Sequence, residues 1–229
     1  MNAVETIQFT LVDSATTRPL EFPVREVVLA GYSGRNQDDV ESHFEELKEL
    51  GLPAPDEAPI FFKVSTNLAT TGQRIEVQDG TTSGEVEFVL LFDESATYVT
   101  VGSDHTSRGF EKHSIPASKQ MYPKVLGRQL WNYADVSDHW DQLILRSWAH
   151  SGGSRKLYQE SAVATMMEPA RLVELARDRV GMGKSGCIFM SGTIPTVVGG
   201  MIYADRLECE LEDPVLGRKI RHAYDIALL

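Results

Sequence analysis

The most informative part of the chain reads Thr82-Ser83-Gly84-Glu85-Val86-Glu87-Phe88-Val89-Leu90-Leu91-Phe92. Its β-rich composition predicts one strand that becomes almost wholly apolar just after the second glutamate. Residues i and i+2 of a strand project from the same face, so Glu85 and Glu87 are expected side by side at the mouth of a buried strand. The alternative is a solvent-facing strand with alternating glutamates, which spacing alone does not exclude.

A third carboxylate, Asp104, follows the next β-rich run, residues 98–101, and Arg108 comes four residues later. Three converging carboxylates suit a hard divalent cation such as Mg²⁺ or Mn²⁺, with water or substrate completing an octahedron. This part of the sequence therefore predicts a metal site on Glu85, Glu87 and Asp104.

Composition restricts the partners of the chain. A formal net charge of −11 over 229 residues argues against nucleic acid or an anionic membrane, because both require a basic surface. The sequence has no signal-like N-terminus and no apolar stretch near 18 residues, so a cytoplasmic protein is expected. Cys187 and Cys209 fall in predicted strands, where buried free thiols are the expected state.

Short strands dominate the predicted elements. Strands are predicted at 6–12, 25–31, 60–64, 74–77, 82–92, 98–101, 142–146, 207–212 and 220–226. Helices are predicted after Asp38 or Asp39 up to about residue 50, and from Pro169 to Val180. This order predicts a β-rich α+β fold, a mixed β-sandwich roll with a few short helices, and excludes a doubly wound sheet.

Two other patterns do not support a site. Residues 181–186 match the glycine spacing of a dinucleotide fingerprint, but they follow a helix and open a strand, which is the inverse of the required context. We interpret them as a helix C-cap and turn. The histidines at 105, 113, 139, 150 and 222 lack any metal-binding spacing, so each is expected as a surface or hydrogen-bonded core residue.

Seven motifs in a fixed order carry a family resemblance. They are Gly34-Arg35-Asn36, Pro59-Ile60-Phe61-Phe62-Lys63, Glu85-Val86-Glu87, the run from Ser103 to Glu111, Ser118-Lys119, Tyr158-Gln159-Glu160, and the run from Ser191 to Gly199. Together they resemble the fumarylacetoacetate hydrolase superfamily along nearly the whole chain. Segments such as Asp213-Pro214-Val215-Leu216-Gly217-Arg218 are more similar to a compact bacterial branch of unknown function, DUF2848.

The resemblance implies a single catalytic domain over residues 1–229, with N-terminal strands and a lid helix at 39–50 inside residues 1–58. It implies a homodimer that binds one Mg²⁺ or Mn²⁺ per chain, with Ca²⁺ as a substitute. Carried over by position, the metal ligands are Glu85, Glu87 and Asp104. Arg108 and Lys119 match residues that hold a substrate carboxylate or enolate oxygen, and Thr193 matches a threonine that contacts a substrate carboxylate.

Three further residues bear on the substrate and the reaction. Glu111 stands where the superfamily has Gln, and its added negative charge should disfavour a diacid substrate. His43 and Glu46 reproduce a His-x-x-Glu pair that activates water in superfamily lyases and hydrolases, although they lie one helical turn late. We expect Glu46 to orient His43 as a general base, the alternative being two solvated residues on an exposed helix.

These residues predict metal-dependent cleavage of a C–C bond in a 1,3-dicarbonyl or acyl-pyruvate-like oxo acid, by hydrolysis or lysis through an enolate. Decarboxylation or keto–enol tautomerisation at the same site is the first alternative, because neither needs an attacking water. Dehydration of a sugar acid is a further alternative reaction, which the fold alone does not exclude. A non-catalytic module that binds a metal or small molecule is the alternative from another class.

Overall fold

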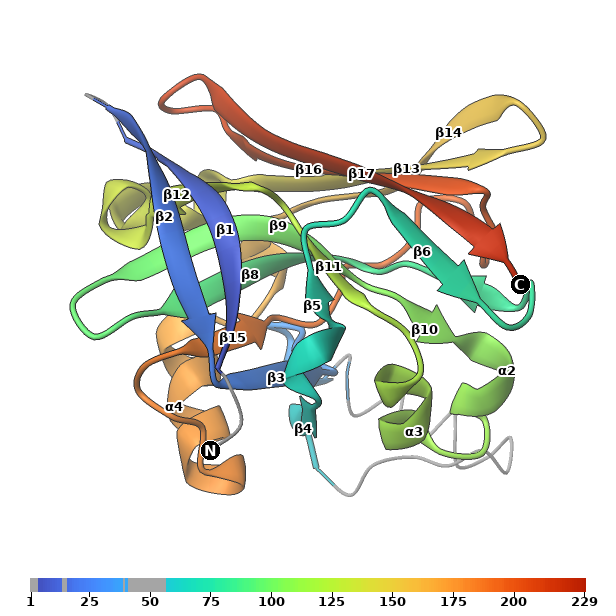
Figure 1. Cartoon of the computed structure of the whole chain (residues 1–229), viewed down its shortest axis with the longest axis horizontal. Coiled ribbons are helices and arrows are strands. Elements are labelled where there is room, and N and C mark those ends of the chain that lie inside the picture. The colour runs from blue at the N-terminus through green and yellow to red at the C-terminus, as the bar shows by residue number, and fades with distance from the viewer. Residues whose placement is uncertain (1–3, 14–15, 39, 41–56) are drawn as a thin grey trace.

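A computed structural model describes residues 4–13, 16–38, 40 and 57–229 of the chain. Strands dominate it, and two large sheets pack against each other as the sequence predicts (Figure 1). The predicted lid helix at 39–50, including His43 and Glu46, lies outside the described residues except for position 40.

The larger sheet is mixed and has the strand order β2-β1-β12-β9-β8-β15-β3-β4, with β11 and β5 attached through β9. Its strands are β1 (Glu5–Val12), β2 (Thr17–Val24), β3 (Glu26–Gly31), β4 (Ile60–Val64), β5 (Ala69–Thr70), β8 (Val86–Phe92), β9 (Thr97–Asp104), β11 (Lys124–Leu126), β12 (Gln129–Asn132) and β15 (Cys187–Met190). The central strand β8 is buried along its whole length. A strand covered on both faces has no need of polar alternation, which explains its apolar sequence.

The second sheet has five strands in the order β14-β13-β16-β17-β6. They are β13 (Ile144–Ser151), β14 (Ser154–Ala162), β16 (Arg206–Asp213), β17 (Arg218–Leu228) and β6 (Arg74–Val77). This sheet lies across β8 and β9 of the larger sheet (Figure 1). Phe88 and Val101 from the larger sheet share one core cluster with Leu207 and Ile220 from the smaller one, so the main core lies between the two sheets.

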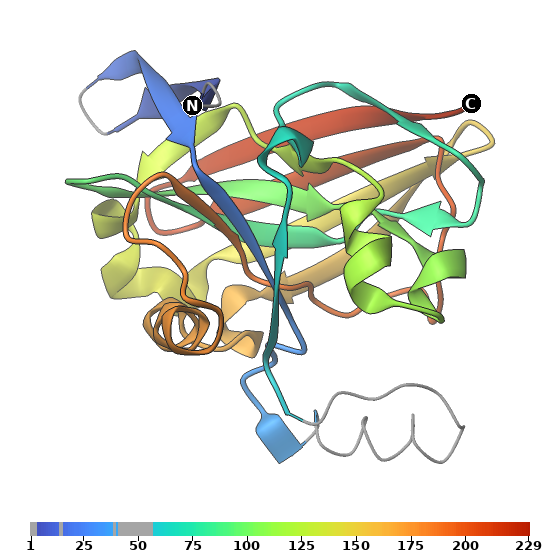
Figure 2. The same cartoon turned by 60° about the horizontal axis from the view of Figure 1, so that its bottom comes forward.

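Helices are short and lie at the periphery. The structure describes α2 (Arg108–Glu111), α3 (Ile115–Gln120) and α4 (Pro169–Val180), with short 3₁₀ helices at 66–68, 133–135, 137–142 and 163–165. The pair α2 and α3 lies on the opposite side of the molecule from α4 (Figure 2). Ser107 caps α2 and Ser114 caps α3, each through its side-chain oxygen. These caps stabilise the two helices that carry Arg108 and Lys119.

The prediction of a single strand over 82–92 is wrong in one respect. The segment forms two strands, β7 (Thr82–Ser83), which pairs with β10 (Thr106–Ser107), and β8, which pairs with β9 and β15. The break falls at Gly84 and Glu85. A Cβ on Gly84 would lie 2.4 Å from the Tyr224 hydroxyl and 2.6 Å from Ser103 Oγ, so only glycine allows β17 to approach this closely.

Other predictions are confirmed. Helix α4 spans the predicted residues, with Pro169 at its start, and Gly181 ends it in the left-handed conformation at φ 61°. The glycine pattern that begins there is therefore a cap and turn, as predicted. Cys187 and Cys209 are buried and free, in strands of different sheets. Within the described part of the chain, no helix is long and apolar enough to cross a membrane.

Candidate metal centre and cavity

Strand pairing brings the three predicted carboxylates together. Glu85 immediately precedes β8, Glu87 lies within it, and Asp104 ends the neighbouring strand β9. The backbone N–H of Asp104 donates to the carbonyl of Glu85 at 3.0 Å. One carboxylate oxygen from each of the three residues lies within 4.8 Å of the others. This is the spacing that a single divalent cation needs from its ligands.

The β8–β9 hairpin sets this register. Its turn is tight, with the N–H of Asp93 donating to the carbonyl of Ala96 at 2.9 Å. The paired residues of the two strands run from Phe92 and Thr97, beside the turn, to Val86 and Ser103. The next pair is Glu85 and Asp104. The short hairpin therefore brings the carboxylates of Glu85 and Asp104 to one place.

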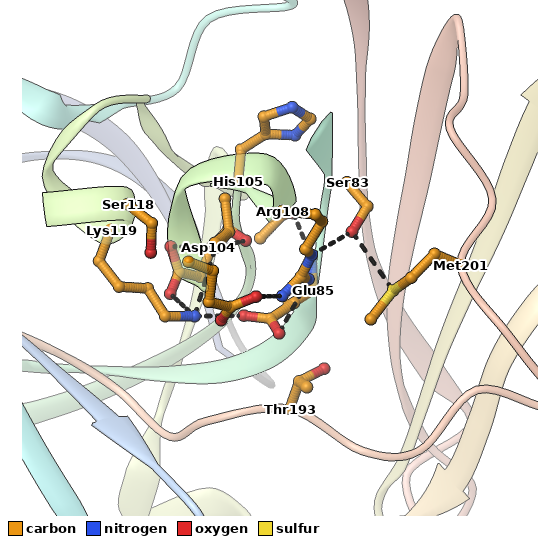
Figure 3. A network of polar contacts seen from close by, with 12 residues as sticks. Ser83, Glu85, Asp104, His105, Arg108, Ser118, Lys119, Thr193 and Met201 are labelled. Atoms are coloured by element: carbon orange, nitrogen blue, oxygen red, sulfur yellow. Dashed lines mark hydrogen bonds and ion pairs between the residues drawn. The ribbon is translucent and has the colours of Figure 1, made fainter. Parts of the chain in front are cut away.

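Arg108 forms the first basic group of the site and lies at the start of α2. Its Nη2 lies 2.9 Å from Glu85 Oε1, its Nη1 lies 2.9 Å from Glu111 Oε2, and its Nε donates to Ser83 Oγ at 2.7 Å (Figure 3). The side chain is only 9% exposed. Burial alone would lower the pKa of Arg108, but the charges of Glu85 and Glu111 outweigh it and raise the pKa.

Lys119 enters from α3 and bridges two of the carboxylates. Its Nζ lies 2.6 Å from Glu85 Oε2 and 2.8 Å from Asp104 Oδ2 (Figure 3). Burial alone would lower its pKa, but Asp104 and Glu85 raise it above the ordinary value. Lys119 is therefore a permanent cation at this site, suited to donate to an oxyanion and unsuited to act as a base at neutral pH.

A second lysine, which sequence reasoning missed, completes the set of cations. Lys124 is fully buried in β11, and its Nζ lies 2.5 Å from Asp104 Oδ1 and 3.0 Å from the carbonyl of His105. The only signal was a lysine beside two apolar residues in the run Lys124-Val125-Leu126, which reads equally well as an edge strand. Pairing across β9 and β11 aligns Lys124 with Asp104, and this long-range register is not readable from local sequence.

The carboxylates respond differently to this environment. Burial alone would raise the pKa of Asp104, but Lys119 and Lys124 lower it to about 2. Burial is likewise outweighed at Glu85, where Arg108 and Lys119 lower the pKa. Glu87 has the opposite shift, because burial, Asp104 and Glu85 together raise its pKa well above the ordinary value.

This charge pattern fits a divalent cation. The Oε2 of Glu87 accepts from the backbone N–H of Gly192 at 3.0 Å, and no ion pair to Glu87 occurs among the described residues. Asp104 Oδ2 has no hydrogen bond of suitable geometry, although Lys119 lies beside it as an ion-pair partner. A buried carboxylate with a raised pKa and a buried oxygen without a hydrogen bond are both stabilised by a bound cation.

A chain of buried hydrogen bonds supports the site from behind. The N–H of Glu85 donates to Ser103 Oγ at 3.2 Å, Ser103 Oγ and the Tyr224 hydroxyl are 2.8 Å apart, and His105 Nδ1 lies 3.0 Å from the same hydroxyl. His105 Nε2 lies 3.0 Å from Thr82 Oγ1. Burial lowers the pKa of His105 to about 3, so the ring is neutral. His105 is a hydrogen-bonded core residue, as the sequence indicated.

Thr193 reaches the site with its hydroxyl directed inward. It donates to the carbonyl of Val86 at 2.8 Å and accepts from Gln159 Nε2 at 2.8 Å. These bonds fasten the loop after β15 to the start of β8. Contact between Thr193 and a substrate carboxylate stays a prediction. Gln159, which the sequence offered only as part of a motif, holds the Thr193 hydroxyl in place.

A cavity of about 1040 Å³ opens over these residues. Glu85, Arg108, Glu111, Lys119 and Thr193 all line it, so the structure brings five of the predicted site residues to one surface. The proposed base pair, His43 and Glu46, lies outside the described residues and contributes nothing to this description.

The cavity also contains a residue that sequence reasoning missed. Tyr32 lines it and has a φ of 53°. Among the described residues, no other non-glycine residue has a positive φ. Bulky side chains rarely adopt this conformation, and such strain is concentrated at functional sites. Burial, with Glu111 as a further cause, raises the pKa of Tyr32, so its hydroxyl holds its proton.

Comparison with known proteins defines the family. The profile of DUF2848, a family of proteins of unknown function, matches residues 30–224. The chain therefore belongs to the DUF2848 family. No curated protein matches it by sequence.

Solved structures share the fold at low identity. One is a putative fumarylacetoacetate hydrolase family protein from Yersinia pestis CO92, with 21% identity, a TM-score of 0.62, and coverage of 90% of this chain and 95% of that one. Another is 5-carboxymethyl-2-hydroxymuconate delta-isomerase from Mycobacterium smegmatis, with 15% identity, a TM-score of 0.63, and coverage of 94% and 84%.

A third is 2-keto-3-deoxy-D-arabinonate dehydratase in complex with magnesium and 2,5-dioxopentanoate, with 16% identity, a TM-score of 0.63, and coverage of 92% and 76%. The fold of this chain is thus that of the fumarylacetoacetate hydrolase superfamily, as predicted. The structural relatives include enzymes, one of them with magnesium bound.

Proposed function

We propose that the chain is a divalent-metal-dependent enzyme that cleaves a C–C bond in an acyl-pyruvate-like oxo acid through an enolate. One observation carries the proposal. Three carboxylates, each supplying an oxygen within 4.8 Å of the others, lie beside two buried cations, and Glu85 and both of these cations line a large cavity. Mg²⁺ and Mn²⁺ are the cations that this all-oxygen ligand set favours.

Glu85, Glu87 and Asp104 would hold the cation. When bound, such a cation supplies Lewis acidity to a 2-oxo acid and stabilises negative charge on its oxygen. Arg108 and Lys119 bind and orient the anionic end of the substrate, since both remain protonated at neutral pH. Lys124, buried behind Asp104, keeps that carboxylate ionised and in place.

Cleavage requires a water and a base to deprotonate it, the part assigned from sequence to His43 and Glu46. This assignment stays a prediction. It is tested by His43→Gln and Glu46→Gln, each of which should slow cleavage while leaving metal affinity unchanged.

The second candidate is oxo-acid decarboxylation or keto–enol tautomerisation, and Tyr32 is the observation that favours it. Both reactions end with protonation of an enolate carbon and need no attacking water. Tyr32 lines the cavity, and its raised pKa keeps a proton on Oη that could be delivered there. Tyr32→Phe should slow these reactions and leave hydrolytic cleavage less affected.

One experiment separates the candidates. Purified protein is incubated with Mn²⁺ or Mg²⁺ and a panel of acyl pyruvates, oxaloacetate and 2-oxo sugar acids, and products are followed by NMR. Cleavage of an acyl pyruvate releases pyruvate and a carboxylic acid, decarboxylation releases CO₂, tautomerisation exchanges the C3 proton for deuterium, and dehydration yields a new oxo group.

The control variants are Glu85→Gln in the site and Glu212→Gln on the outer sheet. Metal-dependent turnover that Glu85→Gln abolishes and Glu212→Gln preserves supports the proposal. Metal binding without turnover across the panel would instead support the non-catalytic binding module. Absence of metal binding would contradict the three-carboxylate site. The homodimer, also a prediction, is checked in the same preparation by sedimentation velocity.

A further inference from the structure

The cavity over the carboxylates has two chemically different walls. Its ionic wall is formed by Glu85, Arg108 and Lys119, close together at the carboxylates (Figure 3). Its apolar wall comes from three separate elements, strand β4, helix α3 and the loop after β15, and is formed chiefly by Ile60, Phe62, Ile115, Ile194, Met201 and Tyr203.

Strand geometry and hydrogen bonds hold the side chains of the apolar wall in place. Ile60 and Phe62 are residues i and i+2 of β4, so both project from the same face toward the cavity. Met201 is 52% exposed, yet its sulfur is held by the Tyr158 hydroxyl at 3.3 Å and by Ser83 Oγ at 3.7 Å. Ser83 is also the acceptor for Arg108 Nε, so Met201 lies directly beside the ionic wall (Figure 3).

The exposure of this wall indicates a ligand. Met201 is 52% exposed, Tyr203 48% and Val197 52%, and all three line the same cavity. Large apolar side chains gathered at the mouth of a cavity are typical of a surface that an apolar group covers.

The charges of the lining disfavour a second carboxylate on that ligand. Arg108 and Lys119 are already paired with Glu85, and Arg108 also with Glu111. Lys112 is the one other basic residue in the described lining, and it is solvent-exposed, where an ion pair adds little. Glu111 and Glu160 also line the cavity, each paired with an arginine, so a carboxylate at the far end of a substrate meets no unpaired buried cation among the described residues.

We propose that this cavity selects an oxo acid with a single carboxylate and an apolar tail, and discriminates against dicarboxylic oxo acids of the same length. The proposal rests on the function proposed above, because it assumes that the 2-oxo acid end lies at the ionic wall. The tail then extends along Ile60, Phe62 and Met201. Glu111 also lines the cavity as a carboxylate and disfavours a second negative charge close to it.

The test compares two isosteric probes. 5-Methyl-2-oxohexanoate ends in an isopropyl group where 2-oxoglutarate has a carboxylate, and the two are otherwise alike. Their binding to Mn²⁺-loaded full-length protein is measured by isothermal titration calorimetry. The apolar probe should bind at least about 10-fold tighter, the discrimination expected when an apolar pocket must accept a charged isostere.

A charge introduced into the apolar wall should reverse the preference. Met201→Lys should narrow or invert the ratio of the two affinities, because it provides the cation that the wall lacks. The matched control is Leu216→Lys, which adds the same charge at an exposed position between β16 and β17, away from the cavity lining, and should leave the ratio unchanged. Glu111→Gln should shift the ratio toward 2-oxoglutarate by a smaller factor.

The outcomes separate this inference from the proposed function. If both probes bind and 2-oxoglutarate binds as tightly or more tightly, the inference is wrong and the metal-dependent oxo-acid site stands. If Mn²⁺ binds but neither probe does, and the panel of oxo acids shows no turnover, the proposed function is wrong and the inference with it. An unchanged affinity ratio in Met201→Lys would also contradict the apolar tail contact.

Discussion

Two ionic clusters in this molecule contain equal numbers of acidic and basic residues but differ in how their charges are paired. The buried cluster, at the cavity, comprises Glu85, Glu87, Asp104, Arg108, Lys119 and Lys124. The sheet-surface cluster, on the five-stranded sheet, comprises Glu160, Glu210, Glu212, Arg146, Lys219 and Arg221. Each has three acidic and three basic residues, yet the charges are distributed differently.

In the sheet-surface cluster every carboxylate has a cation. Arg146 contacts all three, and Lys219 and Arg221 lie 3.2 Å and 2.6 Å from the two oxygens of Glu210. Burial alone would raise the pKa of Glu210, but Arg221 and Arg146 lower it, and Arg146 lowers the pKa of Glu212. The arrangement is balanced without any further ligand, as expected for cross-strand pairs.

In the buried cluster one carboxylate is left over. Arg108 pairs with Glu85 and Glu111, Lys119 bridges Glu85 and Asp104, and Lys124 pairs with Asp104. Among the described residues, no ion pair reaches Glu87. Burial, together with the charges of Asp104 and Glu85, raises the pKa of Glu87 well above its ordinary value. A surface cluster in which every carboxylate is paired with a basic side chain indicates a structural role. A buried cluster with an unpaired carboxylate indicates a site for a cation or substrate.

The largest effect is expected from breaking the buried cluster at Lys124. Lys124→Met leaves Asp104 fully buried with only Lys119 beside it, and should lower the free energy of unfolding by about 3 kcal/mol, as for other broken buried ion pairs. Urea unfolding of the metal-free protein measures this. The double variant Lys124→Met/Asp104→Asn should recover part of the loss, since both charges are then absent. A loss below about 1 kcal/mol would show that Lys124 contributes no more than a surface pair.

The next largest effect sharpens the contrast in charge balance. Glu87→Gln should weaken Mn²⁺ binding by more than about 100-fold, because even changes outside the ligand shell commonly cost 10- to 100-fold. Calorimetry measures the affinity, with Glu212→Gln from the sheet-surface cluster as the matched control that leaves it unchanged.

Glu87→Gln should also stabilise the metal-free protein. A carboxyl whose folded-state pKa is raised contributes stability below its unfolded pKa and loses it as pH rises through the folded pKa. Metal-free wild type should therefore lose stability between acidic and alkaline pH, and Glu87→Gln should remove that part of the slope. Equal slopes in the two proteins would contradict the raised pKa of Glu87.

Asp104 should show the opposite pH dependence. Its pKa falls from an ordinary 3.8 to about 2, a difference worth about 2 kcal/mol. That stability is present above the unfolded pKa and is lost as pH falls through about 2. Urea unfolding between pH 5 and pH 2.5 measures the loss, and Asp104→Asn should flatten the profile. A profile unaffected by that substitution would assign the acid sensitivity to other groups.

Much of the candidate metal centre follows from local sequence. Glu85 and Glu87 are recognisable from their position before an apolar run, and a four-residue turn in the β8–β9 hairpin is enough to bring Asp104 beside them. Helix α4 carries a proline at its start and a glycine at its end, both readable as boundary signals. These features depend on spacing within one element or one hairpin.

The features that could not be predicted depend on contacts between distant segments. Lys124 acquires its role from pairing between β11 and β9, and Gly84 interrupts a strand because Tyr224 approaches it from β17. The left-handed conformation of Tyr32 has no local signature, since no turn-forming residue occupies the position. Tertiary packing determines the first two, and an isolated sequence contains no local record of it.

The smallest effect completes the comparison between the clusters. Arg221 is 69% exposed and pairs with a carboxylate that Arg146 and Lys219 also contact, so Arg221→Ala should lower the free energy of unfolding by only about 0.5 kcal/mol. The loss should shrink in 1 M salt, because exposed pairs are screened. Urea unfolding at low and high salt checks both points, and metal affinity should not change. A loss above about 2 kcal/mol would mean that Glu210 behaves as an isolated buried charge, and the two clusters would then differ in position but not in kind.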